Sequence, residues 1–263
     1  MRVLAVDWSG DARDARRRIR VAEARPGRLR SVRGGLDRDG VGDLLLALRQ
    51  GPTPAAVGLD FSFGLPGWFA RAHGAGDLPG TWALAAADGE RWLRECPPPF
   101  WGRPGTRRPA DDPARPLLRR TEQEAGAQGL HPLSTFQVGG AGAVGTGSVR
   151  GMALLARWRA AGIGVWPLDP APGPEGVLVV EVYPRAMTGP VVKSSGAARA
   201  AHVAADPRIP VELRDDVAAT EDAFDAALAA LGMAEHVDGP ASLGASADPT
   251  DRLEGRMWLP PRG

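Results

Sequence analysis

The sequence is poor in residues that form disulfides or zinc sites. Its 263 residues include one cysteine, Cys96, which excludes an internal disulfide and is typical of a reducing cytoplasm. The four histidines lie far apart, and no Cys/His pair has the spacing of zinc ligands. Any bound metal ion would therefore be held by carboxylate oxygens, the ligands that suit Mg²⁺ and Mn²⁺.

Long apolar runs are also missing. No stretch approaches the roughly 18 apolar residues that a membrane helix needs, so no membrane association is expected. The first ten residues, MRVLAVDWSG, place a polar turn where a signal peptide would carry its apolar region. The sequence therefore predicts a soluble protein that is not exported and lies in the cytoplasm.

The net charge is close to zero. Its value of +1 is not that of a strongly basic nucleic-acid binder. The charges are unevenly spread, since residues 1–120 hold 21 Lys/Arg against 14 Asp/Glu and the remainder holds 11 against 17. The arginine-rich first half is consistent with a phosphate-bearing partner, although arginine-rich composition also follows from GC-rich coding.

Apolar runs separated by turn residues predict a mixed sheet with helices on both faces. The expected strands are residues 2–7, 19–24, 29–32, 55–60, 135–138, 163–168 and 177–183. The expected helices are residues 41–50, 82–96, 148–161, 196–205, 210–216 and 220–231. An antiparallel group followed by parallel strands and helices predicts an α/β fold. We expect one domain over residues 1–263, with the proline-rich stretch 96–116 as a loop insertion.

Three of the expected strands carry an acidic residue at or near their end. Asp7 follows Val-Leu-Ala-Val, Asp60 follows Val-Gly-Leu, and Glu181 lies in Val-Val-Glu-Val-Tyr-Pro. Because ligands bind beyond the carboxyl ends of parallel strands, these three carboxylates are expected to meet at one edge of the sheet. Each could instead be a turn residue or a solvated strand end. Together they predict a cation site, since closely packed like charges need a cation or a proton.

A further pair of acids lies near the start of the last long helix. Asp222 and Asp225 are three residues apart and share a helix face. Thr220 is a suitable N-cap, and the helix dipole favours acids in the first turn, which accounts for Asp222. It does not account for Asp225, which lies among apolar positions and needs a partner if it is buried.

The order of these motifs resembles that of the DUF429 family, a group of predicted ribonuclease H-like nucleases. The resemblance rests on VDWSG, GLDFSFGLP, VVEVYPRA and TEDAFDAALAAL, with Ser-x-Phe-x-x-Gly-Gly at 134–140 and Leu-Glu-Gly at 253–255, and it spans nearly the whole chain. It implies a ribonuclease H-like fold and a metal-dependent phosphodiester hydrolase, with two Mg²⁺ or Mn²⁺ ions held by carboxylates.

The resemblance also implies roles for individual acids. Asp7 would be the first-strand acid that bridges the two ions, Asp60 the second-strand acid, and Asp222 or Asp225 the acid of the last helix. Glu181 matches the late Glu-Val-Tyr-Pro motif and is a candidate catalytic residue. No histidine lies in these motifs, so metal-bound hydroxide is the expected nucleophile.

Aromatic and basic residues near two of these motifs are candidate substrate contacts. Trp8 and Ser9 follow Asp7 directly, and Trp8 could shield the site, stack on substrate or pack in the core. In the proline-rich stretch, Trp101 could stack on single-stranded nucleic acid while basic side chains contact phosphates. These basic candidates are Arg103, Arg107 and Arg108. The alternative is a proline-stiffened loop with Trp101 packed on the core, which we favour.

Two other classes of function are compatible with the sequence. Gly140-Ala-Gly-Ala-Val-Gly145, within the glycine-rich turn 139–147, matches the dinucleotide-binding pattern, although this chain has 35 glycines. The same turn could contact a substrate phosphate at a helix N-terminus. A nucleotide-binding ATPase or kinase of the related actin-like fold is one alternative, although Trp-Ser-Gly-Asp after Asp7 does not favour it. A non-catalytic module that binds a small molecule or a protein is the other.

Overall fold

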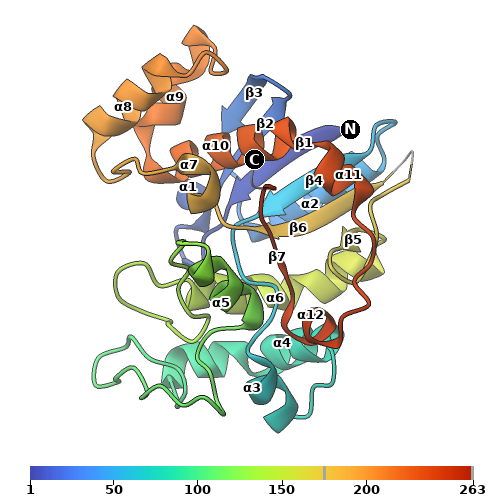
Figure 1. Ribbon diagram of the computed structural model, residues 1–263, viewed down its shortest axis with the longest axis vertical. Helices are drawn as coiled ribbons and strands as arrows, with labels where there is room; N and C mark the ends of the chain where they lie inside the picture. Colours follow the sequence, from blue (N-terminus) through green and yellow to red (C-terminus); the bar gives the residue numbers. More distant parts are fainter. Residues whose placement is uncertain (174–175, 262–263) are drawn as a thin grey trace. The chain divides into compact units, whose positions relative to one another are not determined.

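The computed structural model describes residues 1–173 and 176–261 and has an α/β architecture (Figure 1). The chain forms two compact units. The first contains Met1–Asp60, Ile163–Gly244 and the segment that starts at Trp258, and the second contains Phe61–Gly162 and Ala245–Met257. The expectation of one domain over 1–263 did not include this division. It arises because the segment after Asp60 builds an aromatic core of its own.

A mixed sheet forms the centre of the first unit. Its strands are β1 (Arg2–Asp7), β2 (Arg20–Arg25), β3 (Arg28–Arg33), β4 (Ala55–Leu59), β5 (Gly164–Val165), β6 (Val177–Val182) and β7 (Met257–Trp258). Their order is β3-β2-β1-β4-β6-β5, with β7 beside β6. The neighbours among β1–β3 are antiparallel, whereas β1, β4, β6 and β5 are parallel. The predicted order, antiparallel strands first and parallel strands after, is confirmed.

Eight helical segments of the first unit surround or connect these strands in the described ranges. They are α1 (Ala15–Arg18), α2 (Arg38–Arg49), α7 (Arg185–Thr188), α8 (Gly196–Ala205), the 3₁₀ turn η1 (Val211–Leu213), α9 (Arg214–Ala219), α10 (Glu221–Glu235) and α11 (Asp238–Ser242). Side-chain capping sets some of their starts. Asp37 accepts a hydrogen bond from the Gly40 N–H, so α2 begins three residues before the predicted helix.

Helix α10 packs on one face of the sheet (Figure 1). Phe224 and Leu228 of α10 share a core with every second strand residue, including Val3, Ala56 and Val180. At Gly58 this packing leaves no room for a side chain, because a Cβ there would lie 2.5 Å from Met233 Sδ. The alternate strand residues Leu4, Val57 and Val179 are also buried. Both faces of the sheet are therefore covered, as buried parallel strands require.

Two predicted strands are shorter or absent. Residues 163–168 form only the two-residue strand β5, because the chain turns back and the N–H groups of Leu168 and Asp169 bond the Val165 carbonyl. Residues 135–138 form no named strand and contribute an isolated bridge between Gln137 and Trp101. These corrections leave the order of the sheet as predicted.

The second unit is helical. Its helices are α3 (Gly67–Ala72), α4 (Leu78–Glu95), α5 (Arg120–Ala127), α6 (Gly145–Ala160) and α12 (Pro249–Glu254). Helix α4 begins before the predicted Trp82 because Asp77 caps it. Phe100 stacks on Trp92 with ring centroids 5.5 Å apart, and Phe69 and Phe136 meet it edge-on. The proline-rich stretch 96–116 is irregular, as predicted, but its aromatic residues belong to this core.

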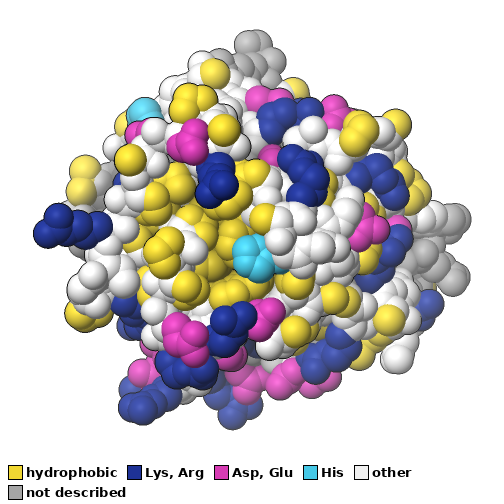
Figure 2. Space-filling model, turned by 90° about the horizontal axis from the view of Figure 1, so that it is seen from below, with side chains coloured by type: hydrophobic (Ala, Val, Ile, Leu, Met, Phe, Trp, Pro, Cys, Tyr) yellow, Lys and Arg dark blue, Asp and Glu magenta, His cyan; other side chains and the backbone are white. Residues whose placement is uncertain are grey.

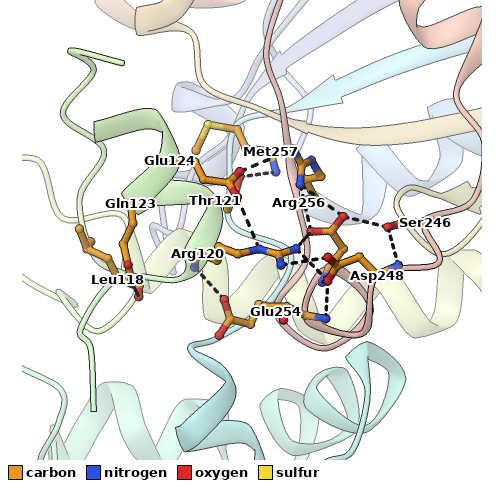
Figure 3. Close-up of polar contacts among 12 residues, drawn as sticks. Leu118, Arg120, Thr121, Gln123, Glu124, Ser246, Asp248, Glu254, Arg256 and Met257 are labelled. Atoms are coloured by element: carbon orange, nitrogen blue, oxygen red, sulfur yellow. Dashed lines mark hydrogen bonds and ion pairs between the residues drawn. The ribbon is translucent and has the colours of Figure 1, made fainter. Parts of the chain in front are cut away.

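Ion pairs hold the second segment of this unit, residues 245–257, against α5 (Figure 3). Arg120 Nη2 lies 2.9 Å from Asp248 Oδ1 and 2.5 Å from Asp251 Oδ1. The Arg120 N–H also bonds Glu254 Oε2 at 2.8 Å. No helix in the described ranges combines the length and apolar character needed to cross a membrane.

Candidate functional site

Two aspartates lie together at the carboxyl edge of the parallel strands. Asp7 ends β1 and Asp60 directly follows β4, and these strands are parallel neighbours with Val6 opposite Leu59. Asp7 alternates with Val3 and Ala5, whose side chains pack in the α10 core. Both carboxylates are half-buried. The sequence prediction that β1 and β4 bring their acids to one edge is confirmed in this respect.

The start of α10 contributes the other two aspartates. Thr220 caps the helix by accepting a hydrogen bond from the Ala223 N–H at 3.0 Å, which fixes the first turn. Asp222 is half-buried, whereas Asp225 is only 7% exposed. The Asp225 Oδ1 atom is buried and has no hydrogen-bond partner in the described residues. A buried carboxylate oxygen left in this way is costly unless a ligand satisfies it.

The pKa values show that the four aspartates act on one another. Burial raises the pKa of Asp7 well above its ordinary range, and the charges of Asp60, Asp222 and Asp225 raise it further. Burial and the charge of Asp225 raise the pKa of Asp60 to about 7. Burial is also the main cause of the raised pKa values of Asp222 and Asp225. We call Asp7, Asp60, Asp222 and Asp225 the aspartate cluster.

Lys193 is the cation that contacts the aspartate cluster through a printed side-chain bond. Its Nζ donates to Asp225 Oδ2, and it lies in the connection between α7 and α8. It is the only lysine of the chain, whose 32 basic residues are otherwise arginines. Sequence reasoning missed Lys193, although this composition was a signal that could have singled it out.

Tyr183, the only tyrosine, also belongs to this region. It follows β6 directly and is half-buried. Burial raises the pKa of its hydroxyl, and the charges of Asp60 and Asp225 raise it further. The sequence prediction considered its segment only for Glu181.

The strand register separates Glu181 from the α10 face. Leu178, Val180 and Val182 of β6 belong to the core with α10, and Glu181 alternates with them. Its side chain therefore leaves the opposite face of the strand. Glu181 is buried at 2% exposure, and its charge still raises the pKa of Asp60. Its place differs from that of the four aspartates, with which the sequence grouped it.

The candidate substrate contacts next to Asp7 are buried. Trp8 and Ser9 are each 8% exposed. Ser9 Oγ accepts a hydrogen bond from the Asp11 N–H, and the Ser9 carbonyl accepts one from Arg38. These contacts give Ser9 a role in the turn after β1, while the burial of Trp8 agrees with the core role that the sequence left open.

In the second unit, Trp101 is buried at 8% exposure, which agrees with the packing alternative for the proline-rich stretch. Arg103, Arg107 and Arg108 are exposed, and Arg108 Nη2 lies 2.6 Å from Asp111 Oδ1. On the face drawn in Figure 2, basic side chains alternate with acidic ones around a patch of apolar side chains. This face is not a continuous basic surface.

The glycine pattern at residues 140–145 has a packing explanation. Gly140 and Gly142 have positive φ values of 84° and 71°, a conformation that favours glycine. A Cβ at Gly145 would lie 2.3 Å from the Thr135 carbonyl oxygen, so the start of α6 requires a bare backbone there. Local geometry accounts for these glycines without a nucleotide.

In the described ranges, no three Asp, Glu, His or Cys residues are arranged to hold one metal ion. The donor chemistry nevertheless fits a divalent cation, because the aspartate cluster offers hard oxygen atoms and Asp225 Oδ1 lacks a partner. The carboxylates of Asp7 and Asp60 also make no hydrogen bond or ion pair with a described residue. The residues that could hold the ion are Asp7, Asp60 and Asp225.

Comparisons with known proteins found no significant match: no family model, no curated protein and no solved structure is similar to this chain.

The raised pKa values predict that the metal-free protein loses stability as pH rises from about 4 to about 7. Folded Asp60 keeps its proton up to about pH 7, whereas the unfolded residue loses it near 3.8. The folded state thus binds more protons in this window, and its free energy of unfolding falls as pH rises. Thermal melting in a chelator between pH 4.5 and 8 measures this slope. Asp60→Asn should flatten it, and a slope that rises with pH would contradict the prediction.

Proposed function

We propose that this protein is a metal-dependent phosphodiester hydrolase of ribonuclease H-like fold, as the resemblance to the DUF429 family implies. The observation that carries the proposal is the aspartate cluster at the edge of the parallel strands, whose members raise one another's pKa values. The antiparallel-then-parallel order of the sheet supports the fold. Mg²⁺ or Mn²⁺ is the cofactor that its oxygen donors suit.

The chain's own residues have distinct roles in this proposal. Asp7 and Asp60 hold the cation from the strand ends, and Asp225 faces them from α10. A bound divalent ion would activate water and neutralise charge on the scissile phosphate. Arg18 and Arg20, whose charges act on Asp222, bring positive charge to the same region for the phosphate. Asp222 orients these arginines.

The test is a substrate screen of the full chain with Mn²⁺ or Mg²⁺. We expect cleavage of RNA, single-stranded or branched DNA, or a small phosphodiester, and we expect a chelator to abolish it. Ca²⁺ should support little turnover, because its larger radius and loose coordination spoil the geometry. Substrate binding should weaken with salt. If no phosphodiester is cleaved faster than the background in buffer, the hydrolase proposal fails and a binding module becomes the better interpretation.

A further inference from the structure

The charges around the aspartate cluster are already partly balanced by the protein. Lys193 pairs with Asp225, and its charge lowers the pKa values of Asp7, Asp60 and Asp225 against the larger raising effects. Arg20 and Arg18 act in the same direction on Asp222. Asp7 and Asp60 are left with the least compensation, and their two negative charges match one divalent cation.

The connection that carries Lys193 is held in place by two arginines. Arg199 of α8 is 8% exposed and donates from Nη1 to the Lys193 carbonyl. Its Nε donates to the Ala218 carbonyl at 3.0 Å, next to the start of α10. Arg185 Nη1 donates to the Val191 carbonyl at 2.8 Å. The Lys193 backbone is thereby tied to the joint between α9 and α10, where Asp225 lies.

The choice of lysine suits this position. Its ammonium is a compact point charge, whereas the arginine guanidinium is a broad planar fork. A compact cation that contacts a carboxylate oxygen can replace a metal ion more closely than a guanidinium can. The Lys193 side chain is 24% exposed and that of Asp225 is 10% exposed, so the pair is shielded from solvent.

We propose that the Lys193 ammonium permanently takes the place of one cation, so that the site binds one divalent ion rather than the two predicted from the sequence. This inference rests on the proposed function. Asp7 and Asp60, with the unpartnered Asp225 Oδ1, form the single ion site. Mg²⁺ is commonly held by one or two carboxylates and completes its coordination with water and substrate phosphate, so this donor set is sufficient. Arg199 and Arg185 are positioning residues for Lys193.

The experiment counts bound Mn²⁺ by calorimetric titration and by electron paramagnetic resonance of the free ion. It uses the full chain without substrate. The wild type should bind one ion per chain, and Lys193→Met should bind two, because the vacated position on Asp225 is then open. Arg30→Met, which removes an exposed charge on β3, should still bind one ion. Lys193→Arg should also bind one.

Two ions in the wild type, no ion, or one ion in Lys193→Met would each overturn the inference. If Lys193→Met does not fold, the wild-type stoichiometry decides alone. Hydrolysis is measured separately. One bound ion without cleavage of any phosphodiester contradicts only the proposed function, whereas two bound ions with cleavage contradict only this inference.

Discussion

Replacing Asp7 with asparagine should remove metal-dependent hydrolysis without destabilising the metal-free protein. Asparagine keeps the size of the side chain but removes a charge that Asp60, Asp222 and Asp225 repel. The activity should fall by more than about 100-fold, since even supporting residues of metal ligands cost about 10- to 100-fold. The melting temperature in a chelator should stay the same or rise, as is common when a functional site is neutralised. Activity assays and thermal melts of the same preparation check both results.

Asp60→Asn should behave like Asp7→Asn, and Mn²⁺ should raise the melting temperature of either variant less than that of the wild type. Asp216→Asn is the matched control, because Asp216 is an exposed acid of α9 outside the cluster. A large loss of metal-free stability in both cluster variants would show that these acids are structural.

Replacing Glu122 with glutamine should strongly destabilise the second unit. The Arg119 and Glu122 side chains are 0% and 1% exposed, and Arg119 Nε and Nη2 lie 2.9 and 2.7 Å from Glu122 Oε1. Removing the carboxylate charge leaves a buried guanidinium without its counter-ion. Breaking a buried pair in this way costs about 3–5 kcal/mol. Chemical denaturation followed by tryptophan fluorescence measures the loss.

The control for Glu122→Gln is an exposed ion pair of the same unit. Glu90 is 66% exposed and pairs with Arg150, so Glu90→Gln should cost less than about 1 kcal/mol. Replacing both Arg119 and Glu122 with apolar residues of similar volume should cost less than Glu122→Gln alone, since no uncompensated charge remains. Equal losses for Glu122→Gln and Glu90→Gln would refute the argument from burial.

The sequence predicted the order of the sheet because its central strands are short apolar runs with acids at their ends. Asp7 and Asp60 could be placed at one edge because parallel neighbours end together. The face of Glu181 could not be predicted, because it depends on which side of β6 the helix α10 covers. Lys193 was missed since only the tertiary path of the α7–α8 connection brings it to Asp225. The second unit was missed because its core joins aromatic residues far apart in the chain.

The presence of a single lysine has a practical consequence for spectroscopy. Amine-directed reagents can modify only Lys193 and the N-terminal amine of this chain. Reductive methylation with ¹³C-formaldehyde would therefore place one side-chain NMR reporter directly beside Asp225, with no mutagenesis and no assignment of other lysines. The chain's arginine-rich composition thus provides a label at the aspartate cluster, where cations and phosphate-bearing ligands can be observed as they bind.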